Sequence, residues 1–74
     1  MATKVKKMEM DLNGNRFYIE PGFADEGVCI MKSSLHSLNM KSEVFTAATL
    51  EELHQTLKAL VEFTEKAIQE RVVL

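Results

Sequence analysis

The 74-residue sequence contains one cysteine, one proline and no tryptophan. Because Cys29 is the only cysteine, the chain cannot form an internal disulfide, and a lone thiol is more typical of a reducing cytoplasm than of secretion. The first residues, MATKVKK, lack the apolar run of a signal peptide, and no segment approaches the roughly 20 apolar residues that span a membrane. These absences predict a cytoplasmic protein without a membrane segment.

The sequence also lacks the clusters of residues that catalysis or metal binding requires. His36, His54 and Cys29 do not have the close spacing of zinc ligands. Cys29 lies in an apolar segment without a neighbouring cation, so we expect a buried and unreactive thiol. The three glycines are isolated and form no phosphate-binding loop. We therefore predict that the protein is not an enzyme and has no catalytic residue, metal or cofactor.

The charge balance is mildly acidic, with 9 basic and 11 acidic residues and a net charge of −2. This is not the composition of a strongly basic nucleic-acid-binding domain. The length predicts one small domain, residues 1–74, in which we expect residues 1–4 to be a disordered N-terminus. A chain this short buries only about 60% of its unfolded surface, so a second subunit is a common source of additional stability.

The segment 5–20 has the pattern of a β-hairpin. Asn13-Gly14 tolerates the positive φ of a two-residue type I′ turn, which fixes the register of the flanking strands. That register sorts the side chains into one apolar face and one charged face with two opposite-charge pairs. The apolar residues are Met8, Met10, Phe17 and Ile19, and the expected pairs are Lys7 with Glu20 and Asp11 with Arg16.

Two more strands and a helix complete the expected fold. A strand near 27–33 is apolar on both faces and therefore central in the sheet, and another strand lies near 40–47. Residues 33–42 fit either strand ends or a loop. Thr49-Leu50-Glu51-Glu52 is a capping box that begins a helix of about residues 50–71. The sequence predicts an α+β fold: an antiparallel sheet of three to four strands followed by one long C-terminal α-helix across its apolar face.

The predicted helix has more apolar surface than this small sheet covers. Its apolar stripe is wider than the roughly 100° needed for docking on one sheet. At about 1.5 Å per residue it is also longer than four strands are wide. The simplest cover is the same helix from a second copy, which predicts a homodimer. The expected interface residues are Leu53, Leu57, Leu60, Phe63, Thr64 and Ala67.

The charged face of the hairpin is a second candidate contact surface. Lys7, Arg16 and Tyr18, with Lys32 near them, combine cations with an aromatic ring, as single-strand-binding surfaces do. Acidic residues share this face and oppose phosphate, which favours a solvated surface with salt bridges. The predicted function is a small non-catalytic homodimeric adaptor or regulatory protein that binds another protein. The alternative is a single-stranded nucleic-acid-binding protein.

Two known families share parts of this pattern. Four strands followed by one helix resembles the element order of the transcriptional-coactivator single-strand-binding domains, which dimerise through the helix and use a basic sheet face. The dense Lys/Arg strands of that family are missing here. The segment 45–53 resembles the strand-to-helix step of HicB-type antitoxins, without their Pro-Asp-Leu-Pro-Gly signature. Both resemblances concern the fold alone, so neither assigns the chain to a family.

Overall fold

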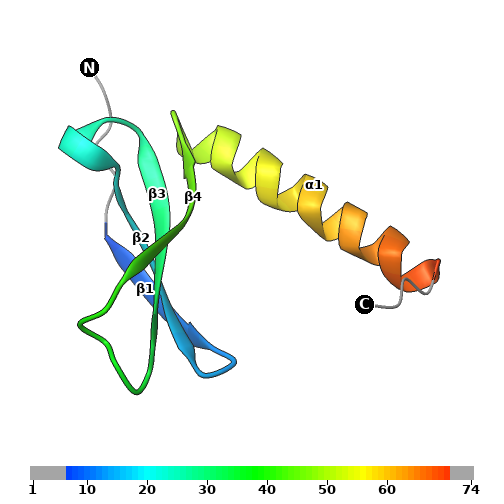
Figure 1. Cartoon of the computed structure of the whole chain (residues 1–74). Helices are drawn as coiled ribbons and strands as arrows, with labels where there is room; N and C mark the ends of the chain where they lie inside the picture. The colour runs from blue at the N-terminus through cyan, green and yellow to red at the C-terminus, as the bar shows by residue number, and fades with distance from the viewer. Residues whose placement is uncertain (1–6, 71–74) are drawn as a thin grey trace.

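The computed structural model describes residues 7–70 as a four-stranded antiparallel sheet followed by one long helix (Figure 1). The strands lie side by side in chain order, so β3 is interior, as the sequence predicts. This confirms the α+β fold, while the predicted N-terminal disorder of residues 1–4 lies outside the described residues. The elements are β1 (Met8–Leu12), β2 (Asn15–Pro21), the 3₁₀ turn η1 (Phe23–Asp25), β3 (Val28–Ser34), β4 (Ser42–Ala47) and α1 (Leu50–Gln69).

The hairpin of β1 and β2 has the predicted register. Asn13 and Gly14 form the turn with φ values of 51° and 78°, as a two-residue type I′ loop requires. Met10 pairs with Phe17 across the strands. The predicted hairpin began at residue 5, but residues 5 and 6 lie outside the described part of the chain.

The open question about residues 33–42 is resolved in favour of a loop between two strand ends. β3 continues to Ser34 and β4 begins at Ser42. Within the loop, the Ser37 N–H donates to the Ser34 carbonyl over 3.0 Å. The Ser34 hydroxyl also accepts a hydrogen bond from the His36 N–H at 3.1 Å. These bonds satisfy backbone groups that no neighbouring strand reaches.

Thr49 caps the helix as predicted, but the return bond of the capping box, from the Thr49 N–H to the Glu52 carboxylate, is not among the hydrogen bonds of residues 7–70. The Thr49 hydroxyl accepts a hydrogen bond from the Glu52 N–H at 3.1 Å, which satisfies one of the free donors of the first turn. The helix runs to Gln69, and the Glu70 N–H bonds to the Lys66 carbonyl at 2.9 Å. The predicted end at residue 71 falls outside the described residues.

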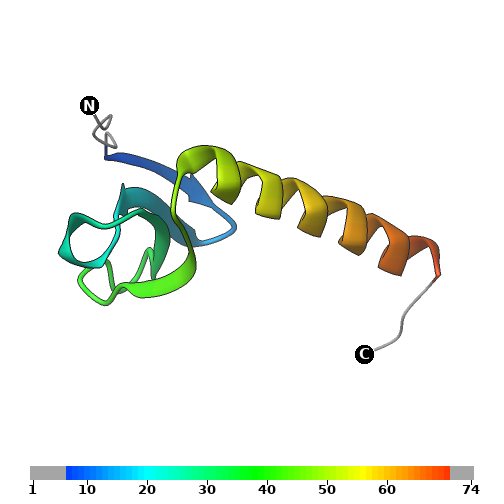
Figure 2. The same cartoon turned by 90° about the horizontal axis from the view of Figure 1, so that it is seen from above.

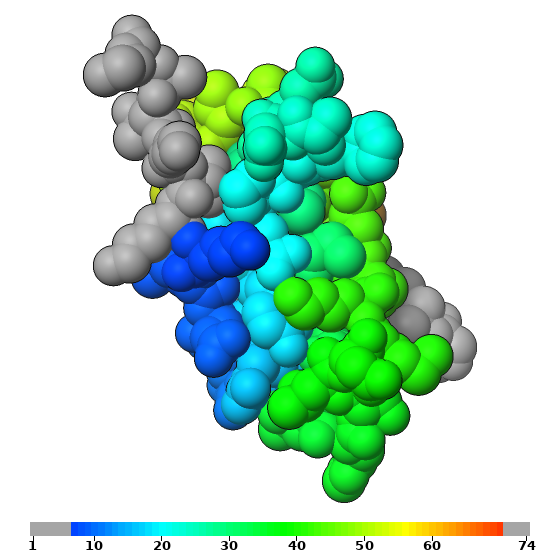
Figure 3. All heavy atoms as spheres, turned by 90° about the vertical axis from the view of Figure 1, so that its left-hand side faces the viewer, coloured from blue at the N-terminus to red at the C-terminus, as the bar shows by residue number. Residues whose placement is uncertain are grey.

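Strand alternation gives the sheet two different faces. We call the face that carries Phe17 and Ile30 the apolar sheet face, and α1 lies on this side (Figures 1 and 2). The opposite face, seen in Figure 3, is the polar sheet face. The apolar sheet face comprises Met8, Met10, Leu12, Phe17, Ile19, Val28, Ile30 and Phe45, and the polar sheet face includes Asp11, Arg16, Tyr18, Glu20 and Ser33.

The helix does not lie across the apolar sheet face, contrary to the sequence-based expectation. Its main contacts are with β4 and β3, where Val28 is fully buried and Leu53 is 2% exposed. Beyond its first turns α1 projects away from the sheet (Figure 2). Only two residues, Ala48 and Thr49, connect β4 to α1. The helix therefore begins directly at β4, the edge strand of the sheet, and this short connection determines its direction. The radius of gyration is 14.4 Å, whereas a compact chain of this length has about 11 Å.

Candidate interaction surfaces

The projecting part of α1 carries an uncovered apolar surface. Phe63 is 68% exposed and Ile68 is 75% exposed, and helical periodicity places both at the margins of one stripe. We call this stripe the α1 apolar face; it comprises Leu57, Leu60, Phe63, Thr64, Ala67 and Ile68. Large apolar side chains left in water on a projecting helix are typical of a surface that docks on another molecule.

The six residues predicted for a dimer interface do not all belong to this exposed surface. Leu53 is buried within its own chain against the end of the sheet, so it anchors α1 instead of contacting a partner. Leu57, Leu60 and Ala67 are half-buried, while Phe63 and Thr64 are exposed. The structure therefore brings five of the six together on the free part of the helix.

A second uncovered apolar surface lies on the same side of the molecule. Met8, Met10 and Leu12 of β1 are 61%, 57% and 48% exposed, and they define the β1 apolar strip. The sequence interpretation placed Met8 and Met10 on the apolar face of the hairpin, which we expected to form part of the core. They are exposed because α1 packs at the β3–β4 end and leaves β1 uncovered.

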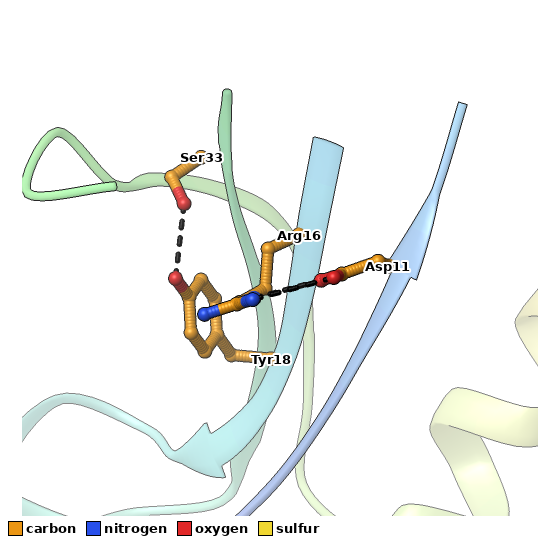
Figure 4. A network of polar contacts seen from close by, with 4 residues as sticks. All are labelled: Asp11, Arg16, Tyr18 and Ser33. Carbon is orange, nitrogen blue, oxygen red and sulfur yellow. Dashed lines mark hydrogen bonds and ion pairs between the residues drawn. The ribbon is translucent and has the colours of Figure 1, made fainter. Parts of the chain in front are cut away.

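Arg16 and Asp11 form the predicted ion pair on the polar sheet face (Figure 4). Arg16 Nε donates to Asp11 Oδ1 at 2.7 Å, and Nη2 donates to Oδ2 at 3.3 Å. These hydrogen bonds hold the pKa of Asp11 below its ordinary value and raise the pKa of Arg16. The guanidinium is thus already engaged by a carboxylate of its own chain.

Lys41, which the sequence interpretation did not single out, covers Tyr18. Its Nζ lies 2.8 Å from Glu20 Oε2 and 4.1 Å from the centroid of the Tyr18 ring, a cation–π geometry. The hydrogen bond to Glu20 raises the pKa of Lys41. Glu20 therefore forms its ion pair with Lys41 and not with Lys7, the partner predicted from the sequence. Tyr18 is only 9% exposed to solvent.

The four residues predicted for a nucleic-acid or partner face are not gathered into one surface. Arg16 and Tyr18 are on the polar sheet face, whereas Lys32 pairs with Phe17 and so lies on the apolar sheet face. Lys7 is exposed immediately before β1. The β2–β3 register decides the position of Lys32, and the sequence of the connecting residues 22–27 does not indicate this register.

The loop between β2 and β3 presents an aromatic side chain that the sequence interpretation missed. Phe23 is 96% exposed. The next residues, Ala24 and Asp25, have φ values of 57° and 59°, a left-handed conformation that costs about 1–2 kcal/mol per residue without glycine. Strained backbone is often retained at functional sites, and exposed aromatic residues are frequent binding anchors. The sequence signal was an aromatic residue between Gly22 and Gly27.

The groups that carry reactive chemistry are not assembled into a site. Cys29 is buried, its Sγ lies 3.7 Å from the Pro21 carbonyl oxygen, and burial raises the pKa of its thiol. A thiol in this state is a poor nucleophile. Between residues 7 and 70, no group of three or more His, Cys, Asp or Glu residues is arranged to hold a metal ion.

Comparisons with protein-family models, with curated proteins and with solved structures gave no match to this chain. The described part of the chain contains no helix of sufficient length and apolarity to cross a membrane.

Proposed function

We propose that this protein is a small non-catalytic adaptor or regulatory protein that acts as a homodimer and binds another protein. The observation that carries the proposal is the uncovered α1 apolar face. Phe63 and Ile68 are both more than two-thirds exposed on a helix whose anchor, Leu53, is already buried. A second copy supplies an identical surface and removes both from water.

The position of the exposed apolar side chains supports this assembly. Val61, Phe63 and Ile68 of the projecting helix are 55%, 68% and 75% exposed, and fully burying a side chain of this kind contributes about 1.5–3 kcal/mol. A second copy docked on this part of α1 therefore removes several large apolar side chains from water.

The Phe23 loop is the part of the molecule best suited to contact a different protein. Phe23 is a protruding aromatic side chain, and the exposed carboxylates of Asp25 and Glu26 follow it. A fitting partner has an apolar pocket for the ring with cationic side chains at its edge. In capture experiments with lysate of the native host, a specific partner binds the wild type and is lost with Phe23→Ser.

The dimer is tested with a pair of matched charge substitutions. Leu60→Asp places a carboxylate on the α1 apolar face, and Gln55→Asp places the same group on the outer side of the helix. We expect the first to give monomer or unfolded chain and the second to remain dimeric, because burying an unpaired charge is costly. If sedimentation equilibrium shows that the folded wild-type protein is a monomer, the proposal is contradicted.

Single-stranded nucleic-acid binding is the second candidate function. Of the cations predicted for this face, Lys7 and Lys32 form no ion pair in the described structure, whereas Arg16 is bonded to Asp11. Binding of this kind weakens steeply as salt rises. Fluorescence anisotropy with labelled oligonucleotides decides it: a salt-dependent complex favours this function, and no binding at low salt eliminates it.

A further inference from the structure

The direction of α1 leaves an open angle between two uncovered apolar surfaces of the same chain. One side of this angle is the α1 apolar face, and the other is the apolar sheet face with the β1 apolar strip (Figures 1 and 2). Val28 and Leu53 close the angle only at its apex, where helix and sheet meet. Any arrangement that covers the helix alone leaves Met8, Met10 and Leu12 in water.

We propose that a second copy of the chain fills this angle, with the two α1 helices antiparallel and the end of each helix on the apolar sheet face of the other copy. This arrangement rests on the proposed homodimer and specifies its geometry. In such a two-fold symmetric dimer, each contact between the copies occurs twice. Both apolar surfaces of both copies are therefore covered.

The length of the helix agrees with this geometry. α1 contains 20 residues and is therefore about 30 Å long. With the two-fold axis beside Leu60, near its midpoint, Leu57 of one copy lies beside Phe63 of the other. Ile68 then lies alongside position 52 of its partner, close to where that partner's helix meets its own sheet.

The helix dipoles also favour the antiparallel orientation. Each α1 has a partial positive charge at its N-terminal end and a partial negative charge at its C-terminal end, so an antiparallel pair places opposite ends beside each other. A parallel pair places like ends together, including the two first turns with Glu51 and Glu52, and leaves the two β1 apolar strips uncovered.

Cysteine crosslinking distinguishes these arrangements. All variants carry Cys29→Ala, so that each introduced cysteine is the only thiol. A mixture of Met8→Cys and Ile68→Cys chains is refolded together, oxidised and analysed by non-reducing electrophoresis and mass spectrometry. Glu9→Cys replaces Met8→Cys in the control, because Glu9 is its neighbour on the polar sheet face.

We expect at least about tenfold more heterodimer from positions 8 and 68 than from positions 9 and 68, since a disulfide needs Cα atoms within about 7 Å. In the antiparallel pair the two Ile68 positions are about 24 Å apart along the axis, so Ile68→Cys alone gives no disulfide. A 68–68 disulfide, or a dimer in which neither pair crosslinks, overturns the antiparallel arrangement but not the dimer. A wild-type chain that sediments as a folded monomer overturns both.

Discussion

The ammonium nitrogen of Lys41 lies 4.1 Å from the centroid of the Tyr18 ring. Lys41, in the loop that precedes β4, thereby covers Tyr18 on the polar sheet face, and the same ammonium group bonds to Glu20 at 2.8 Å. The Lys41 ammonium group, the Glu20 carboxylate and the Tyr18 ring are thus engaged with one another within the fold.

Removing the Lys41 side chain should expose the Tyr18 ring. Tyr18 is the only tyrosine and the chain has no tryptophan, so intrinsic fluorescence reports on this ring alone. We expect acrylamide to quench Lys41→Ala more strongly than the wild type, with Lys58→Ala as a control on the exposed helix surface. Equal quenching in all three proteins contradicts a covering role for Lys41.

The buried hydroxyls of Tyr18 and Ser33, 3.0 Å apart, should be energetically coupled. Tyr18→Phe leaves the Ser33 hydroxyl without this partner at 2% exposure, which costs about 1–2 kcal/mol. Combining it with Ser33→Ala removes both polar groups, so we expect the double variant to lose less stability than the sum of the singles. Urea unfolding of the four proteins measures the coupling, and strict additivity is the result that rules it out.

Two glycines with positive φ should respond differently to alanine. At Gly27, with φ +70°, an added Cβ lies 2.4 Å from the Ala47 carbonyl oxygen, whereas at Gly14, with φ +78°, no heavy atom lies within 4 Å. We expect Gly14→Ala to cost about 1 kcal/mol through its dihedral alone. Gly27→Ala should cost clearly more, because β4 must also move. Similar urea midpoints for the two variants contradict this account of the β3–β4 junction.

The Asp11–Arg16 pair should make a small pH-dependent contribution to stability. The hydrogen bond from Arg16 lowers the pKa of Asp11 in the folded state, so its contribution is present above the unfolded pKa of about 3.9. It is lost as the pH falls through the lower folded value. The Tm difference between wild type and Asp11→Asn should therefore be largest near neutral pH and vanish in strong acid. A Tm difference between the two proteins that increases as the pH is lowered contradicts this prediction.

Local chemistry explains which parts of the fold the sequence predicts well. Asn13-Gly14 and strand alternation agree on one hairpin register, and Thr49 marks the helix start with a hydrogen bond that the structure contains. Both signals act over a few residues, where backbone preferences and side-chain capping decide the conformation.

The features that the sequence did not predict depend on contacts between distant segments. Lys41 replaces Lys7 as the partner of Glu20 because the loop before β4 folds back over β2. Lys32 reaches the apolar sheet face through the β2–β3 register. The apolar pattern of α1 predicts an apolar stripe along the helix but not the direction in which the helix leaves β4.

The mass of the wild-type protein in solution is the most direct test of the central claim, that the uncovered side of α1 is an interface between two copies. Sedimentation equilibrium at micromolar concentration should give twice the 8.4 kDa of one chain. A mass of one chain up to high micromolar concentration, with circular dichroism showing a folded protein, contradicts the claim.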